Sequence, residues 1–338
     1  MENTATKPKI GDAVVRVLNG MAQGLFASLI IGLIIKQIGT YAHIDLLVSI
    51  GQIAQYMTGP AIGVGVANAV GAPPLARFSA AVSGAVGAGT IALSTYALSA
   101  GEPLGATVAA LVGALCGKWI SGKTKVDIIL VPIVTIIAGS IVGVFLSPVV
   151  SALMNAIGAF INRLTQLYPF PMGIMVSVVV GMVLTLPISS AAICISLGLD
   201  GLAAGAACCG CCCQMIGFAF SSYKENGVGG LISQGLGTSM LQIPNIWKNW
   251  KIWIPPTLTS AVLGPVSTCL FRMTNNASGA GMGTSGLVGQ FNAVAVMGPG
   301  CIWQIALLHF ILPAVLSLCI STFMRRRGWI KDGDMLLS

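Results

Sequence analysis

Residues 126–148 read VDIILVPIVTIIAGSIVGVFLSP, and Asp127 carries the only charge in this run. A helix needs roughly 20 mainly apolar residues to cross the hydrocarbon core of a bilayer, so the run predicts a membrane-spanning helix. The composition extends this prediction to the rest of the chain, because 55% of the 338 residues are hydrophobic and 8% are charged. Soluble domains carry about 25% charged residues. We therefore expect an all-α integral membrane protein.

Ten segments have the apolarity of a spanning helix, and two of them are short. They run approximately 13–38, 44–70, 77–99, 104–120, 126–148, 150–165, 172–197, 201–222, 253–272 and 301–324. No stretch is long and polar enough to form a soluble domain. The sequence therefore predicts a single transmembrane domain over residues 1–338, with about ten transmembrane helices.

The basic residues indicate how the chain is oriented. Eight of the 17 Lys and Arg residues lie at Lys7 and Lys9, in the loop 118–125 and at Arg325–Arg327. Cytoplasmic loops of membrane proteins carry an excess of Lys and Arg. We therefore expect a multi-pass protein of the cell (cytoplasmic) membrane with both termini cytoplasmic. Nucleic-acid binding would need a basic stripe with interleaved aromatic residues, so the expected partner is the lipid bilayer and not nucleic acid.

The chain also resembles itself when it is shifted by 127 positions. The shift aligns Ile34 with Ile161, Lys36 with Arg163, Tyr41 with Tyr168, Pro60 with Pro187 and Gly71 with Gly198. Each half, about 13–148 and 150–324, would hold five helices. An odd number of spans makes the copies point oppositely, which predicts two inverted five-helix repeats. We expect Pro60 and Pro187 to kink their helices and to contribute to gating.

Two glycine-rich stretches are too polar to face lipid. The first is GVGGLISQGLGTSMLQIPN at about 227–245, named hairpin 1, and the second is NNASGAGMGTSGLVGQFNAVAVMGPG at about 275–300, named hairpin 2. By the charge pattern, hairpin 1 begins and ends at the cytoplasmic face and hairpin 2 at the outer face. We expect two re-entrant hairpins that enter the membrane from opposite sides.

A short motif occurs in both hairpins, as GLGTS at Gly235–Ser239 and as GMGTS at Gly281–Ser285. Glycines permit left-handed or tightly turned backbone, and Thr-Ser after such a turn suits a helix N-cap. Two helix N-termini near mid-membrane can hydrogen-bond a polar solute. Neutral hydroxyls and amides suit a polyol or sugar better than a bare cation. Capping of the motif's own helix is the alternative role for these hydroxyls.

The candidate substrate-binding residues are therefore the glycines, hydroxyls and amides of the two hairpins. They are Gln234, Gly235, Gly237, Thr238, Ser239, Gln242 and Asn245 in hairpin 1, and Asn275, Asn276, Gly281, Gly283, Thr284, Ser285, Gln290 and Asn292 in hairpin 2. Unpaired amides within a membrane are costly, which favours a functional role for them.

Other reactive residues have simpler interpretations. Five of the ten cysteines fall within 208–213, and adjacent helical residues point in different directions, so we expect apolar packing and no metal site. His43 and His309 are isolated, which favours a structural role. We find no nucleotide-binding loop and no Ser/His/Asp set, and we expect no catalytic residue and no cofactor.

The stretches QGLGTSMLQIPN at 234–245 and NNASGAGMGTSGLVGQ at 275–290 resemble the membrane subunit IIC of the bacterial sugar phosphotransferase system. Within that family the chain resembles the perfringolysin-regulator-like (PfoR-like) group. The resemblance implies ten helices with two re-entrant hairpins, a homodimer and an elevator-like movement that translocates sugar. It also implies a separate IIB protein that donates the phosphoryl group.

The chain departs from that pattern at the acidic residues. Characterised IIC subunits place a Glu and a His at the sugar within the membrane, whereas Glu2, Glu102 and Glu225 here lie in a tail or in loops. Any sugar phosphorylation would require separate IIA and IIB proteins. Three functions stay open: a IIC-type permease for a small polar solute such as a sugar, a non-transporting membrane sensor or regulator derived from it, and an ion-coupled carrier of another small solute.

Overall fold

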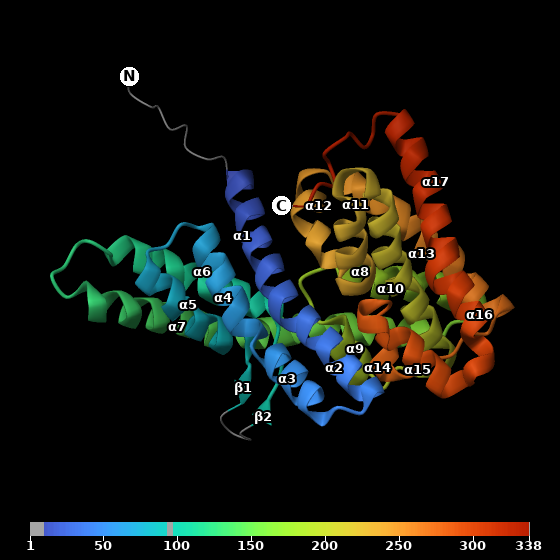
Figure 1. The fold of residues 1–338 in the computed structure, drawn as a ribbon, viewed down its shortest axis with the longest axis horizontal. Helices are drawn as coiled ribbons and strands as arrows, with labels where there is room; N and C mark the ends of the chain where they lie inside the picture. The colour runs from blue at the N-terminus through green and yellow to red at the C-terminus, as the bar shows by residue number, and fades with distance from the viewer. Residues whose placement is uncertain (1–9, 93–96, 338) are drawn as a thin grey trace.

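The computed structural model describes residues 10–92 and 97–337, and Figure 1 draws the helices that make up most of this part of the chain. Its one regular sheet is a two-residue antiparallel pair, β1 (Ile91–Ala92) and β2 (Ala97–Leu98). Five helices of the described residues are long and apolar enough to cross a membrane. They are Gly11–Ala42, Pro103–Ile120, Asp127–Thr165, Gly201–Ser221 and Pro299–Arg326. The all-α membrane class is confirmed, whereas the count of ten spans stays a prediction.

The first part of the chain forms a long helix and then a group of packed helices. In order these are α1 Ile10–Leu25, the π-helical turn η1 Phe26–Ile30, α2 Ile31–Ala42, α3 Asp45–Tyr56, α4 Thr58–Ala69, α5 Pro74–Ala88, α6 Pro103–Ile120 and α7 Asp127–Thr165. Since α1, η1 and α2 follow one another without a break, they form one continuous rod.

The second part has three longer helices, interrupted by short helical pieces. In order these are α8 Pro169–Thr185, α9 Ser190–Ser196, α10 Gly201–Ser221, α11 Tyr223–Ile232, η2 Ser233–Gly237, η3 Ser239–Gln242, α12 Ile243–Lys248, η4 Trp250–Trp253, α13 Ile254–Pro265, η5 Val266–Leu270, α14 Ala277–Ala280, η6 Ser285–Leu287, α15 Val288–Met297, η7 Pro299–Cys301, α16 Ile302–Ile305, η8 Ala306–Ile311 and α17 Leu312–Arg326. The last four elements follow one another as one helical segment.

Several predicted helix boundaries are wrong. The segments predicted at 126–148 and 150–165 form the single helix α7, because Pro148 is accommodated inside it. A Pro within a membrane helix is tolerated when neighbouring groups pair the freed backbone atoms. The segment predicted at 77–99 stops at Ala88, where Gly89 has a φ of 66° and caps α5 in the left-handed region.

Two further predicted helices are each broken in two. The segment 44–70 divides at Met57 into α3 and α4, and Pro60 falls in the first turn of α4. The segment 172–197 divides between α8 and α9, where Pro187 lies outside both helices. Proline lacks the backbone N–H that would continue a helical ladder, and it disfavours helical backbone in the preceding residue.

The helices form two groups on either side of the α1 rod (Figure 1). One group contains α4, α5, α6 and α7, and the other contains α8, α10, α13 and α17. Helices approach closely where glycines meet: a Cβ placed on Gly181 would collide with the carbonyl of Gly210, and one on Gly87 with the carbonyl of Gly105. Small residues let membrane helices pack backbone to backbone.

Two pairs of helices start with the spacing of the aligned residues. Helix α5 begins at Pro74 and α10 at Gly201, while α7 begins at Asp127 and α13 at Ile254. Both pairs are 127 positions apart, as are Gly71 and Gly198, which have φ of 65° and 57°.

Candidate solute-binding site

Hairpin 1 is built from α11, η2, η3 and α12. Its helix breaks at Thr238, whose φ and ψ of −160° and 143° are extended. The Thr238 hydroxyl accepts a hydrogen bond from the Met240 backbone N–H at 3.2 Å. The predicted capping role is therefore confirmed in this copy of the motif.

Hairpin 2 turns more sharply, through α14, η6 and α15. Gly283 has a φ of 54°, and a Cβ there would meet the side chain and backbone of Cys211 on α10. The predicted left-handed turn is therefore confirmed at Gly283. Gly281 packs against α9, where the Ser190 hydroxyl donates to the Gly281 carbonyl at 2.7 Å.

The two copies of the motif touch each other directly. The Thr284 hydroxyl donates to the carbonyl of Gly235 at 2.5 Å, and the Ser285 hydroxyl donates to the carbonyl of Gly237 at 2.8 Å. On the other side, Ser239 pairs with the Thr185 hydroxyl of α8 at 2.8 Å. The predicted meeting of the two hairpins is thus present in the fold, since all of these atoms are buried.

A cavity of about 210 Å³ opens where the hairpins meet the α1 rod, and we call it the hairpin cavity. Thr238 and Met240 of hairpin 1 line it together with Met282 and Ser285 of hairpin 2. Apolar side chains such as Leu29 form most of the remaining wall, and no charged residue is among the described residues that line it. An apolar wall with a few placed polar groups is typical of small-molecule sites.

Three polar groups at this cavity were not predicted. The Gln55 amide nitrogen lines it, is buried, and has no hydrogen-bond partner within the described residues. Ser189 also lines it, and its hydroxyl accepts from the Ala192 N–H at 3.2 Å, which leaves the hydroxyl proton available. The signal for Gln55 was present in the sequence, because a polar amide inside an apolar run is costly in a membrane.

Glu102 is the third group, and it lies beside the cavity. Its neighbours Gly101 and Pro103 line the cavity, and its carboxylate accepts from the Ser189 backbone N–H at 3.3 Å. Burial raises the pKa of the Glu102 carboxyl, and the Ser189 N–H opposes that rise in part. The sequence placed Glu102 in a loop, which is correct, but this loop packs against Ser189 before α9, and the acid is half-buried.

The predicted amides of hairpin 1 do not line the cavity. The Gln242 amide donates to Gln234 at 2.8 Å and to the Met335 carbonyl at 3.0 Å. The Asn245 amide donates to Gln242 at 2.8 Å and to the Leu336 carbonyl at 2.9 Å. These amides therefore fasten the segment 335–336 onto hairpin 1.

The predicted amides of hairpin 2 are also used within the protein. The Asn275 amide donates to the Gly289 carbonyl at 2.9 Å, and the side-chain Oδ1 of Asn276 accepts from the Gly279 N–H at 3.0 Å, which caps α14. The amide of Asn276 donates to Asn292 at 2.9 Å. These three residues shape the hairpin, and the residues that line the cavity do not include them.

Gln290 belongs to a separate buried cluster. Its amide nitrogen lies 3.1 Å from His309 Nδ1 and 3.3 Å from Cys212 Sγ. The ligand atoms of Cys208, Cys212 and His309 all lie within 4.8 Å of one another. His309 is therefore less isolated than the sequence indicated, because residues one turn apart on α10 share a face toward it. Cys211 turns elsewhere, with its thiol 3.8 Å from the Val180 carbonyl.

The two prolines proposed for gating lie in different surroundings. Pro187 directly precedes Ile188 and Ser189, which line the hairpin cavity. Pro60 lies on α4 and is not among the lining residues.

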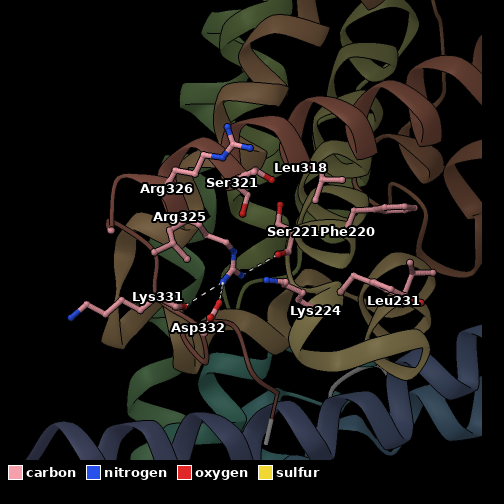
Figure 2. A pocket seen from close by; sticks show the side chains of 14 residues that line it. Phe220, Ser221, Lys224, Leu231, Leu318, Ser321, Arg325, Arg326, Lys331 and Asp332 are labelled. Atoms are coloured by element: carbon pink, nitrogen blue, oxygen red, sulfur yellow. Dashed lines mark hydrogen bonds and ion pairs between the residues drawn. The ribbon is translucent and has the colours of Figure 1, made fainter.

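A second, larger cavity lies between the ends of α10 and α17 and the start of α11, with a volume of about 1040 Å³. Figure 2 shows Arg325 at its centre. The Arg325 guanidinium is 3.1 Å from Glu225 and 3.3 Å from Asp332, and it donates to the Ser221 carbonyl at 3.2 Å. We call this cavity the basic pocket. No residue of either GxGTS motif lines it within the described chain, so the smaller hairpin cavity is the better solute site.

Comparison with protein families gives one match. The family model described as "Phosphotransferase system, EIIC" matches residues 15–337, which is nearly the whole chain. Comparison with curated proteins gives no match, and neither does comparison with solved structures.

Proposed function

Because the chain belongs to the phosphotransferase-system EIIC family, we propose that it is a membrane permease subunit that carries a single sugar unit through the hairpin cavity. The observation that supports this most strongly is the junction of the two GxGTS motifs, where Thr238 and Ser285 line the same cavity.

The size and chemistry of the cavity favour a small neutral solute. Its volume of about 210 Å³ lies below the roughly 300–1,000 Å³ of sites for drug-sized ligands. The Gln55 amide can donate, the Glu102 carboxylate beside the cavity can accept, and the Thr238 and Ser189 hydroxyls can do either. Sugar hydroxyls also donate and accept, so this set can pair several of them at once.

The half-buried carboxylate of Glu102 gives a role to an acid that the sequence analysis assigned only to a loop. Glu102 would accept a hydrogen bond from a sugar hydroxyl and hold the sugar in one orientation. A phosphoryl donor would be a separate IIB protein, and the sugar hydroxyl that faces it would be fixed by this contact. This arrangement replaces the Glu expected within a spanning helix by a Glu at the start of α6.

The helical framework supports a movement of one group of helices against the other. The shared spacing of 127 positions between α5 and α10 and between α7 and α13 supports two related halves. We propose that the hairpins and the group around α10 carry the sugar, while the group around α7 stays in place. Pro187 beside the cavity would serve as a hinge.

We further propose the orientation and the assembly. The face that carries Arg325–Arg327 and the loop 118–125 is cytoplasmic by the excess of Lys and Arg. Lys7 and Lys9 lie outside the described residues. The apolar face of α7, with Phe145 75% and Ile128 73% exposed, would contact lipid and the second copy of a homodimer.

A sensor function is the alternative, and one observation favours it. The segment 335–336 is hydrogen-bonded to hairpin 1 through Gln242 and Asn245. Solute binding at the hairpins would thus alter a surface segment that a partner protein could bind. An ion-coupled carrier has less support, because no charged residue is among the described residues that line the cavity, and Glu102 beside it already accepts from the Ser189 N–H.

The proposal is tested by ligand binding to the purified full chain in detergent. Sugars, polyols and small acids are screened by thermal stabilisation, where a ligand at about 100 times its Kd stabilises by roughly 2.7 kcal/mol. We expect a monosaccharide to stabilise the protein and the effect to be lost in Gln55→Ala. The matched control is Thr40→Val on the exposed end of α2. Stabilisation by an acid alone, or by sugar equally in Gln55→Ala, would contradict the proposal.

Transport is then separated from sensing in vesicles. Phosphorylated sugar that accumulates only when IIA and IIB proteins are supplied supports the permease. Binding without accumulation in the same vesicles supports the sensor.

A further inference from the structure

The basic pocket adjoins a third cavity, which is wholly apolar. This third cavity has a volume of about 480 Å³ and lies between α10, hairpin 1 and the segment from η8 to α17. We call it the apolar groove. Phe220 and Leu231 line both cavities, so the two share a wall. One end of the combined site is charged and the other end is lined by apolar side chains and glycine alone.

One face of the last helical segment runs along both cavities. Ile311 and Val315 line the apolar groove, while Leu318, Thr322 and Arg326 line the basic pocket. These residues are three or four positions apart, so they share a helix face. At 1.5 Å per residue the stripe is about 22 Å long. One leaflet of a bilayer, with its headgroups, is about 20–22 Å thick, which is the length of a phospholipid.

The charges of the basic pocket are only partly balanced. Arg325 is held by Glu225 and Asp332, and these are the only ion pairs within the described residues. Lys224 and Arg326 are exposed and also line the pocket, so the pocket carries an excess of positive charge. In Figure 2 the Lys224 side chain extends toward the centre of the pocket and Arg326 lies along its rim. Basic pockets beside membrane helices attract anionic headgroups.

We infer that this combined site binds an anionic phospholipid. The phosphate lies between Lys224 and Arg326, and one acyl chain follows Leu318 and Val315 into the apolar groove. Charge complementarity fits the headgroup, and the apolar lining, from which polar side chains are absent in the described residues, fits the chain.

The groove connects this lipid to the hairpins. Gly235 and Leu236 of hairpin 1 line its inner end. The carbonyl of Gly235 is the acceptor for Thr284 of hairpin 2. An acyl chain in the groove therefore packs against the backbone that joins the two motifs, and the bound lipid braces hairpin 1.

The test compares lipids that differ only in the headgroup. The full chain in detergent is titrated with phosphatidylglycerol and with phosphatidylcholine of the same acyl chains, and retention is measured by native mass spectrometry alongside thermal melting. We expect retention and stabilisation by phosphatidylglycerol. In Lys224→Gln/Arg326→Gln we expect affinity about 30-fold weaker, since each basic residue near an anionic lipid contributes about 1 kcal/mol. Lys123→Gln/Lys125→Gln removes two exposed charges elsewhere and should leave binding unchanged.

Two further arms separate the lipid from a free anion. Val315→Gln changes only the apolar groove, and we expect it to weaken phosphatidylglycerol binding as well. Inorganic phosphate and glycerol phosphate carry the headgroup charge without acyl chains. If they stabilise the protein as strongly as the lipid does, or if the two lipids bind equally, the inference is overturned. The headgroup comparison uses the unaltered protein, so it holds even if a variant fails to fold.

Discussion

The two GxGTS motifs have nearly the same sequence but form different hydrogen bonds. In hairpin 1 the Thr238 hydroxyl caps its own helix and lines the cavity. In hairpin 2 the Thr284 and Ser285 hydroxyls donate to the backbone of the other motif. Both copies line the cavity, through Thr238 and Ser285, but only the hydroxyls of the second copy donate to the backbone of the other motif. A repeated motif therefore does not fix the hydrogen bonds that each of its residues forms.

The largest difference is expected between Gly283 of hairpin 2 and Gly235 of hairpin 1. Gly283→Ala would place a Cβ against the Cys211 backbone at a φ of 54°. Left-handed strain of about 1–2 kcal/mol and overpacking of about 1–3 kcal/mol should destabilise the protein and remove solute binding. Gly235→Ala meets Ala219 and Ile216 only at 3.5 Å, so its stability should change little. Thermal melting of both variants tests this, and equal losses would contradict the assigned difference.

Substitution of Thr284 should lower mainly the stability of the protein, whereas substitution of Thr238 should lower mainly its affinity for the solute. Thr284→Val removes the donor to Gly235 and leaves a buried carbonyl unpaired, which costs about 1–3 kcal/mol. We expect a lower melting temperature, with weaker solute binding as a consequence. Thr284→Ser keeps the hydroxyl and should restore most of the stability. A melting temperature unchanged in Thr284→Val would show that the contact between the motifs is dispensable.

Thr238→Val tests the other half of the comparison. It removes a cap, which costs about 0.5–2 kcal/mol, and it removes a hydroxyl from the cavity. We expect solute affinity to fall about tenfold, the effect of losing roughly 1.4 kcal/mol. Equilibrium binding measures the loss, and melting of the solute-free protein measures the cap. If Thr238→Val and Thr284→Val lower stability and affinity in the same proportion, the two motifs do not differ in role.

The smallest effect is expected at Glu102, which belongs to neither motif. Its pKa is raised by burial from an ordinary value of 4.5, so the folded protein binds this proton more tightly than the unfolded chain does. The resulting destabilisation is absent at pH below 4.5 and grows as the pH rises through the folded pKa. Glu102→Gln should therefore melt higher than the parent at pH 7 but at a similar temperature near pH 4, while binding solute more weakly. Melting curves across this range check the sign.

The sequence predicted the membrane class from composition, and it predicted the cap at Thr238 and the turn at Gly283 from local backbone chemistry. Gly283 illustrates this, since a glycine in such a turn needs no distant partner. The partners of the amides could not be predicted, because Gln242 pairs with a carbonyl 93 residues later. Glu102 was overlooked for the same reason: its burial depends on how the loop before α6 folds back onto α9. The division between 148 and 150 failed because the helix continues through Pro148 to Thr165.

The bonds from Gln242 and Asn245 to the carbonyls of Met335 and Leu336 set an order of events during synthesis. Hairpin 1 leaves the ribosome long before its last hydrogen-bond acceptors are made. Until then the amides of Gln242 and Asn245 lack those acceptors, so hairpin 1 cannot form its full set of hydrogen bonds. A chain that ended before Met335 would keep its spanning helices but would lack the hydrogen bonds that hold hairpin 1 to the segment 335–336.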